Sequence, residues 1–373
     1  MKKREAGFTL IELLITMVIF VLVLSAGSQI FTGLLTQFKQ QSKIAETNIE
    51  GIVGLEILKQ DIEHAGYGLP WVIPTGVTYS EASSSPASTY NDASNSPRAV
   101  ISGNGTGFNG SDYLVIKAIN VATNDTSQKW TTLQASSPYV RTWTPSSENL
   151  AADDSVIVLN PGTEINSRTL VVNGTTFSTT YNNVTSSPWP PSDVTEARIV
   201  YGIDNTSLRM PFNRADYFVR RFDGSGNNIT PQRCAPNTGV LEKATVKQSG
   251  GGLTYLPLLD CAAEMQVDFW LDTDADGNIN WPPSDDISGL TAQQIREQVK
   301  EVRLYIVAHE GQRDVNYDFS MNNTREALSA LETLSGNSRT IAFVNLKTLL
   351  GDPEYKHYRW KLYTIVVKPN NLR

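Results

Sequence analysis

The chain is organised by its first helix-forming segment, residues 2–35, which reads KKREAGFTLIELLITMVIFVLVLSAGSQIFTGLL. Three basic residues come first, and from Phe8 to Leu24 nearly every side chain is apolar, with Glu12 as the one charged exception. An apolar run of this length is long enough to cross a bilayer as a helix, and the preceding basic residues would hold that end in the cytoplasm. The segment therefore predicts an N-terminal membrane helix.

Three interpretations of this segment compete. A secretory signal peptide would be cut near the small residues 25–27, but its apolar region would then contain a carboxylate. A plain signal anchor leaves Glu12 as an unexplained cost of roughly 3 kcal/mol in the membrane. Neither interpretation uses the Gly7–Phe8 junction. The third rests on GFTLIELL, residues 7–14, which closely resembles the site where prepilin peptidase cuts after the glycine of a type IV prepilin.

The prepilin resemblance implies processing at the N-terminus and a role for one carboxylate. Residues 1–7 would be a leader that the peptidase removes between Gly7 and Phe8, and Phe8 would become the N-methylated first residue. In that family the glutamate at the position of Glu12 is understood to meet the N-terminal amine of a neighbouring subunit. Glu12 is therefore expected to be an assembly residue, and the alternative is an incidental glutamate that snorkels to the membrane surface.

One very long helix is predicted over residues 8–66, because no proline occurs before Pro70. Its first part, residues 8–35, is apolar all round and would form the transmembrane or filament-core segment. Residues 36–66 are amphipathic, and their apolar side should pack on the rest of the chain. That apolar stripe consists of Ile52, Leu55, Leu58, Ile62 and Ala65.

The charge balance argues against a nucleic-acid partner. The full chain carries a net charge of −7, and loss of residues 1–7 removes three positive and one negative side chain, which leaves −9. A phosphate backbone requires clustered Lys and Arg, whereas in the mature chain the only adjacent pair is Arg220–Arg221. Charged residues make up 18% of the chain, a low share that favours an exported β-rich protein over a cytosolic enzyme.

The chain has two cysteines, Cys234 and Cys261. In an oxidising periplasm or at a cell surface they would form a disulfide, which stabilises by about 3 kcal/mol in the chain-entropy model. The alternative is two separate buried thiols. A metal site built on them is not expected, because they form no C-x-x-C pair and the three histidines are distant in the sequence.

Residues 67–373 are predicted to form a periplasmic or extracellular head, here called the head, of mostly antiparallel strands with long loops. Residues 70–112 contain turn and loop chemistry with few residues able to fill a core. Two helices are expected, over residues 291–298 and 324–334. The strands are expected at residues 113–119, 155–159, 169–172, 197–203, 217–222, 265–271, 302–308 and 358–367. The fold class is thus α+β: a long N-terminal helix packed on a β-rich head, as in type IV pilins.

One segment of the head resembles a metal-binding loop. Residues 272–280 read DTDADGNIN and match the first nine positions of a calcium loop. The predicted calcium ligands are Asp272, Asp274, Asp276, Asn278 and Asn280, with Asn278 acting through its backbone carbonyl. The closing glutamate is missing, because Pro283 occupies its position, so Asp285 or Asp286 would have to close the site. The alternative is a polar turn in which the aspartates cap backbone amides.

No enzyme signature accompanies this loop. The sequence contains no GxSxG, P-loop or HExxH motif, and none of its histidines has a context that suggests a catalytic base. The sequence therefore predicts a protein that is not an enzyme.

Later segments narrow the resemblance to one branch of the pilins. LEILKQDIEHAGYG, residues 55–68, is similar to the end of the long helix in PilW-type minor pilins, and LLDCAAEMQVDFWLDTDADG, residues 258–277, is similar to their strand and Asp-rich turn. This resemblance implies a low-abundance subunit that joins other minor pilins, the major pilin and a tip adhesin, and primes assembly at the filament tip. It would wait in the bacterial inner membrane with its head in the periplasm, and then occupy the pilus tip.

Two other functions remain open from the sequence. GspJ-type minor pseudopilins of type II secretion are the nearest related branch and share the same helix chemistry. The chain could also be a membrane-anchored, calcium-dependent binding module that never enters a filament. Such a module would keep residues 1–7.

Overall fold

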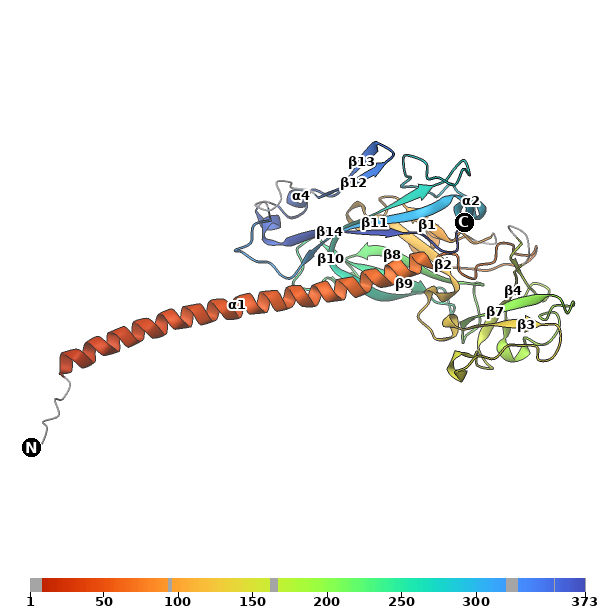
Figure 1. Ribbon diagram of the computed structural model, residues 1–373, viewed down its shortest axis with the longest axis horizontal. Helices are drawn as coiled ribbons and strands as arrows, with labels where there is room; N and C mark the ends of the chain where they lie inside the picture. Colours follow the sequence, from red (N-terminus) through yellow and green to blue (C-terminus); the bar gives the residue numbers. More distant parts are fainter. Residues whose placement is uncertain (1–8, 93–95, 162–166, 320–327, 352, 373) are drawn as a thin grey trace, which may run out of the picture.

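The structure is a computed structural model that describes residues 9–92, 96–161, 167–319, 328–351 and 353–372. It consists of one long helix and a β-rich head (Figure 1). This arrangement confirms the predicted α+β class.

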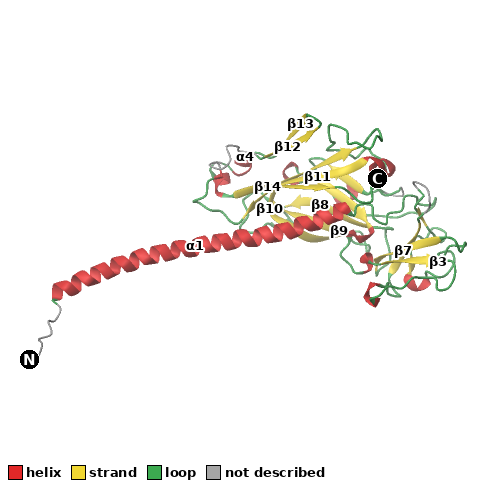
Figure 2. Ribbon diagram, viewed as in Figure 1, coloured by secondary structure: helices red, strands yellow, loops and turns green. Residues whose placement is uncertain are grey.

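The first helix, α1, spans Leu10–Glu63 and contains 54 residues, so it is about 80 Å long. Thr9 caps its N-terminus, and Gly66 and Gly68 follow its end with φ values of +81° and +67°. Glycine adopts such left-handed backbone angles without steric cost, because it has no Cβ. Figure 2 shows the first half of α1 extending away from the head, and the second half lying along it.

The main sheet of the head has seven antiparallel strands in the order β1-β2-β8-β9-β10-β11-β14. The strands are β1 (Val100–Gly103), β2 (Tyr113–Ala118), β8 (Asn213–Arg220), β9 (Gly239–Val246), β10 (Leu253–Leu271), β11 (Val299–Glu310) and β14 (Arg359–Val367). The C-terminal half of α1 packs mainly on β10. The side chains buried between α1 and this sheet belong to the largest apolar core.

A second sheet forms a lobe beside the main one (Figure 1). Its strands run in the order β3 (Trp130–Gln134), β7 (Ala197–Asp204), β4 (Ser155–Asn160) and β5 (Thr169–Leu170), and β6 (Thr179–Thr180) also pairs with β4. The described remainder comprises α2 (Ala292–Gln298), α4 (Leu346–Leu350), the hairpin of β12 (Ser329–Leu334) and β13 (Asn337–Ala342), and short 3₁₀ turns at Ala87–Tyr90, Phe108–Gly110, Ile119–Val121, Thr126–Gln128, Ser146–Glu148, Tyr181–Asn183 and Glu354–His357.

Three sequence predictions about these elements are wrong. The helix expected over residues 324–334 is instead the strand β12 in its described part, because Ser335 and Gly336, both with positive φ, turn the chain back into β13. Ile52 is 57% exposed, because the buried line on α1 runs through Gly51 and Gly54 and turns Ile52 outward. Residues 70–112 contribute several buried side chains as well as the strand β1.

Candidate functional site

The described N-terminus of α1 is closed by a reciprocal pair of hydrogen bonds. Glu12 Oε2 accepts from the backbone N–H of Thr9 at 2.9 Å and from its hydroxyl at 2.8 Å, while Thr9 Oγ1 accepts from the Glu12 N–H at 3.4 Å. This is a capping box, which starts the helix and satisfies two backbone donors. Gly7 and Phe8, the predicted cleavage and methylation residues, lie outside the described residues.

The first half of α1 has no cover from the head. Every residue from Thr9 to Lys39 is exposed, including large apolar side chains such as Leu10 at 83% and Phe20 at 62%. By length and composition α1 is able to cross a membrane. An apolar surface of this extent is stable only in lipid or against other apolar surfaces, so this half of α1 is a membrane or assembly segment.

The second half of α1 docks closely on β10. A Cβ added to Gly54 would lie 1.9 Å from the backbone oxygen of Leu258, so only glycine allows this approach. Leu58 and Ile62 are fully buried one and two turns further along. The docked half therefore fixes the direction in which the exposed half leaves the head.

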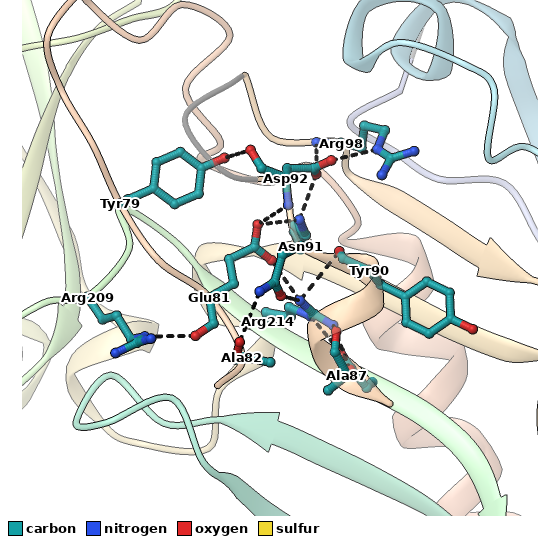
Figure 3. Close-up of polar contacts among 12 residues, drawn as sticks. Tyr79, Glu81, Ala82, Ala87, Tyr90, Asn91, Asp92, Arg98, Arg209 and Arg214 are labelled. Carbon is teal, nitrogen blue, oxygen red and sulfur yellow. Dashed lines mark hydrogen bonds and ion pairs between the residues drawn. The ribbon is translucent and has the colours of Figure 1, made fainter. Parts of the chain in front are cut away.

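The opposite face of the main sheet holds a buried cluster of charges (Figure 3). Lys117 of β2 and Arg214 of β8 are directly opposite each other across the strand pair, and both are fully buried. Two like charges in this position repel each other. Glu81, from the segment between α1 and β1, bridges them: its Oε1 accepts from Lys117 Nζ and its Oε2 from Arg214 Nη1, both at 2.8 Å.

Further partners complete the charge balance of this cluster. Asp92 Oδ2 accepts from Lys117 Nζ at 2.6 Å, and Arg214 makes two bonds to Asp216, at 2.7 and 2.8 Å. Burial alone would raise the pKa of Asp92, but Lys117 and Arg98 outweigh it, and the pKa is lowered. The cluster contains the cations Arg98, Lys117 and Arg214 and the anions Glu81, Asp92 and Asp216. Because its charges are matched, we interpret it as a clamp that holds residues 79–92 on the sheet.

The structure joins Cys234 and Cys261 in a disulfide, with Cα atoms 4.9 Å apart. His309 of β11 is beside it, within 4.8 Å of the sulfurs, although it is distant in the sequence. His309 Nε2 accepts from the Ala235 N–H at 2.8 Å, and burial lowers the pKa of His309 to about 3. The imidazole is therefore neutral at physiological pH and supports the backbone next to the disulfide.

The Asp-rich loop follows β10. The carboxylates of Asp272, Asp274 and Asp276 gather within 4.8 Å of one another, as their spacing predicts. Within the described residues, neither Asp285 nor Asp286, the candidates for closing the site, belongs to this group of carboxylates. The charge of Asp285 acts on Asp112, Asp268 and Arg339, and Asp286 Oδ1 accepts from the Ser288 N–H at 2.8 Å. The group therefore consists of three carboxylates, those of Asp272, Asp274 and Asp276.

Comparison with known families decides how the N-terminal segment is interpreted. Residues 2–28 match a family model described as the prokaryotic N-terminal methylation motif. The chain has a prepilin-type N-terminus. This finding supports a type IV pilin-like protein that is anchored in a membrane by α1, and proteins with this motif are normally structural rather than catalytic. The comparisons with curated proteins and with solved structures give no match.

Proposed function

We propose that this prepilin-type chain is a PilW-type minor pilin that helps to initiate type IV pilus assembly at the filament tip. Prepilin peptidase would cut it in the inner membrane between Gly7 and Phe8, and Phe8 would be N-methylated. Its partners would be other minor pilins, the major pilin and a tip adhesin. We further propose that the protein has no catalytic activity of its own.

The observation that carries this proposal is the exposed half of α1 with its single carboxylate. Among the described residues, the Glu12 carboxylate accepts hydrogen bonds from Thr9 alone, and all its neighbours on α1 are exposed. A carboxylate in an apolar segment requires a partner when lipid or protein surrounds it. The N-terminal amine of a neighbouring mature subunit would supply one, and this pairing would set the axial position of the two helices.

The size of the head supports a position at the tip. Subunits of the shaft repeat closely, whereas this head contains two sheets and a hairpin on one helix. The docking of α1 through residues 51–62 leaves its exposed half free to enter a filament core while the head stays outside. A large head is accommodated most easily where no further subunit has to stack above it.

A Glu12→Leu variant tests the assembly role. We expect it to be exported and cleaved normally, but to leave cells with few or no pili. A Thr9→Val variant is the matched control, because it removes the capping hydroxyl and keeps the Glu12 carboxylate. Normal piliation by Glu12→Leu would refute the role of Glu12.

The remaining alternative is a GspJ-type minor pseudopilin, which would use the same N-terminal chemistry. A deletion strain separates the two functions. Loss of surface pili with intact secretion supports the minor pilin, whereas loss of secreted enzymes with intact pili supports the pseudopilin.

A further inference from the structure

Backbone hydrogen bonds hold the loop between Asp272 and Asn280 at both ends, one to the last residue of α2 and one to the last residue of β10. The Asp272 N–H donates to the carbonyl of Gln298 at 2.8 Å, and the Asn280 N–H donates to the carbonyl of Leu271 at 2.7 Å. Gly277, with φ of +87°, permits the sharp turn between these ends. The loop is close to α2, at the end of the head away from the exposed half of α1 (Figure 1).

This closed loop holds its three aspartates at a separation that suits one ion. Oxygen ligands bind calcium at about 2.3–2.6 Å, so two oxygens on the same ion are at most about 5 Å apart. One carboxylate oxygen from each of Asp272, Asp274 and Asp276 lies within 4.8 Å of the other two. Lys300 is a weak counter-charge, with its Nζ 3.9 Å from Asp272 Oδ2. The three carboxylates therefore repel one another unless a cation is present.

Asp272 gives a second, independent indication of a ligand. It is only 4% exposed, and its Oδ2 accepts from the Gly277 N–H at 3.1 Å. Its Oδ1 is buried and has no hydrogen-bond partner within the described part of the chain. A buried carboxylate oxygen without a partner is unfavourable, and a bound ion or water is one explanation for such a group.

We propose that this loop binds one calcium ion through the carboxylates of Asp272, Asp274 and Asp276. By its position in the loop, the backbone carbonyl of Asn278 is a fourth ligand, and water completes the shell. Asn280 supports the loop instead, because its Oδ1 accepts from the N–H and hydroxyl of Thr273 at 2.5 and 2.9 Å. Without a bidentate closing carboxylate, the dissociation constant is expected to be about 10⁻⁴–10⁻³ M, as in extracellular modules.

Bound calcium would stiffen the connection between β10 and β11, which are neighbours in the main sheet. It would also neutralise the loop's excess negative charge at a site remote from α1. This inference is independent of the proposed role in pilus assembly, since it requires only the folded head. A calcium-free loop would leave the pilin proposal intact.

The test uses the full-length chain in detergent with terbium as the probe. Trp281 follows the loop directly, so excitation of tryptophan should sensitise the luminescence of bound Tb³⁺. We expect calcium to quench this signal by displacement, and magnesium to do so poorly. In a D274N/D276N variant, the sensitised terbium luminescence should be weaker by about tenfold or more. The wild-type Tm should rise by about 2 °C when chelator is replaced by about 10 mM calcium.

A matched control removes the same charge elsewhere. Asp193 is exposed and Asp223 is half-buried, and both cap backbone amides of turns outside the loop, so a D193N/D223N variant should keep the terbium signal and the calcium-dependent Tm shift. Equal Tm values of the two double variants in chelator would show that neither is misfolded. The proposal is overturned if D274N/D276N behaves like this control, if calcium leaves the wild-type Tm unchanged, or if magnesium displaces terbium as well as calcium does.

Discussion

The carboxylate of Asp61, near the end of α1, accepts a hydrogen bond from Lys243 Nζ of β9 at 2.5 Å. Tyr217 of β8 donates its hydroxyl to the same carboxylate. Both members of the ion pair are largely buried, with side-chain exposures of 12% and 5%. The pair ties the helix that we propose to enter the filament to two central strands of the head.

Breaking this ion pair should loosen α1 from the head. Asp61→Asn leaves the Lys243 ammonium buried without its counter-charge, which is expected to lower the free energy of unfolding by about 3–5 kcal/mol. Denaturant unfolding of the full chain in detergent measures the loss. In a D61L/K243M double variant, which buries no charge, most of the stability should return. Glu63→Gln on the same helix is the control, because its partly exposed contact with Lys59 is worth about 0.5 kcal/mol or less. An equal loss in the control would contradict the assigned role of the buried pair.

Because α1 approaches β10 closely, replacing its glycines by alanine should lower stability by amounts that depend on the space around each glycine. Gly54→Ala would force a methyl group onto the backbone of Leu258 and should destabilise by about 1–3 kcal/mol. Gly51→Ala would meet only the end of the Leu259 side chain, 2.8 Å away, and should cost less. Gly27→Ala has open space around it and should cost nothing. Thermal melting ranks the three variants, and a Gly54→Ala protein as stable as Gly27→Ala would show that the helix is not docked in this way.

The buried charge cluster predicts that Glu81 holds its segment on the sheet. Glu81→Gln removes the negative charge that bridges Lys117 and Arg214, which lie opposite each other on β2 and β8. We therefore expect the free energy of unfolding to fall by about 3 kcal/mol. Hydrogen exchange should quicken over residues 79–92 more than elsewhere. The exposed Glu148 gives the control, since Glu148→Gln removes the same charge without a buried partner. Unchanged exchange in residues 79–92 of Glu81→Gln would count against the clamp.

His309 predicts how stability depends on pH. Its folded-state pKa of about 3 is below the ordinary 6.5, so between these values the unfolded chain binds a proton that the folded chain excludes. Stability from this group is therefore present above pH 6.5 and is lost as the pH falls toward 3, by up to about 1.4 kcal/mol for each pH unit. His309→Gln should flatten the stability profile over this range, whereas the exposed His64→Gln should keep the wild-type slope. Identical slopes in all three proteins would contradict the assignment.

The sequence predicted the elements that are specified by neighbouring residues in the chain. The absence of proline before Pro70 and the apolar stripe predicted α1, and the spacing of the three loop aspartates predicted their convergence. The strands predicted at residues 113–119, 197–203 and 302–308 match β2, β7 and β11 within a few residues.

The missed features are those stabilised by partners far away in the chain. β9 was not predicted, because it contains the charged residues Glu242 and Lys243. In the structure these two side chains pair with Arg220 and Asp61. Glu81 is separated by 133 residues from Arg214, so residues 70–112 were interpreted as loop although the segment covers a sheet face. The position of His309 beside the disulfide likewise arises only from the pairing of β10 with β11.

Mass spectrometry of the N-terminus of the protein, purified from its native membrane, tests whether the chain is a processed prepilin. A processed prepilin predicts a first peptide that begins with N-methylated Phe8, and loss of the peptidase should restore residues 1–7. A chain that still begins at Met1, or one cut near residues 25–27, would contradict the pilin account and leave a membrane anchor or a signal peptide in its place.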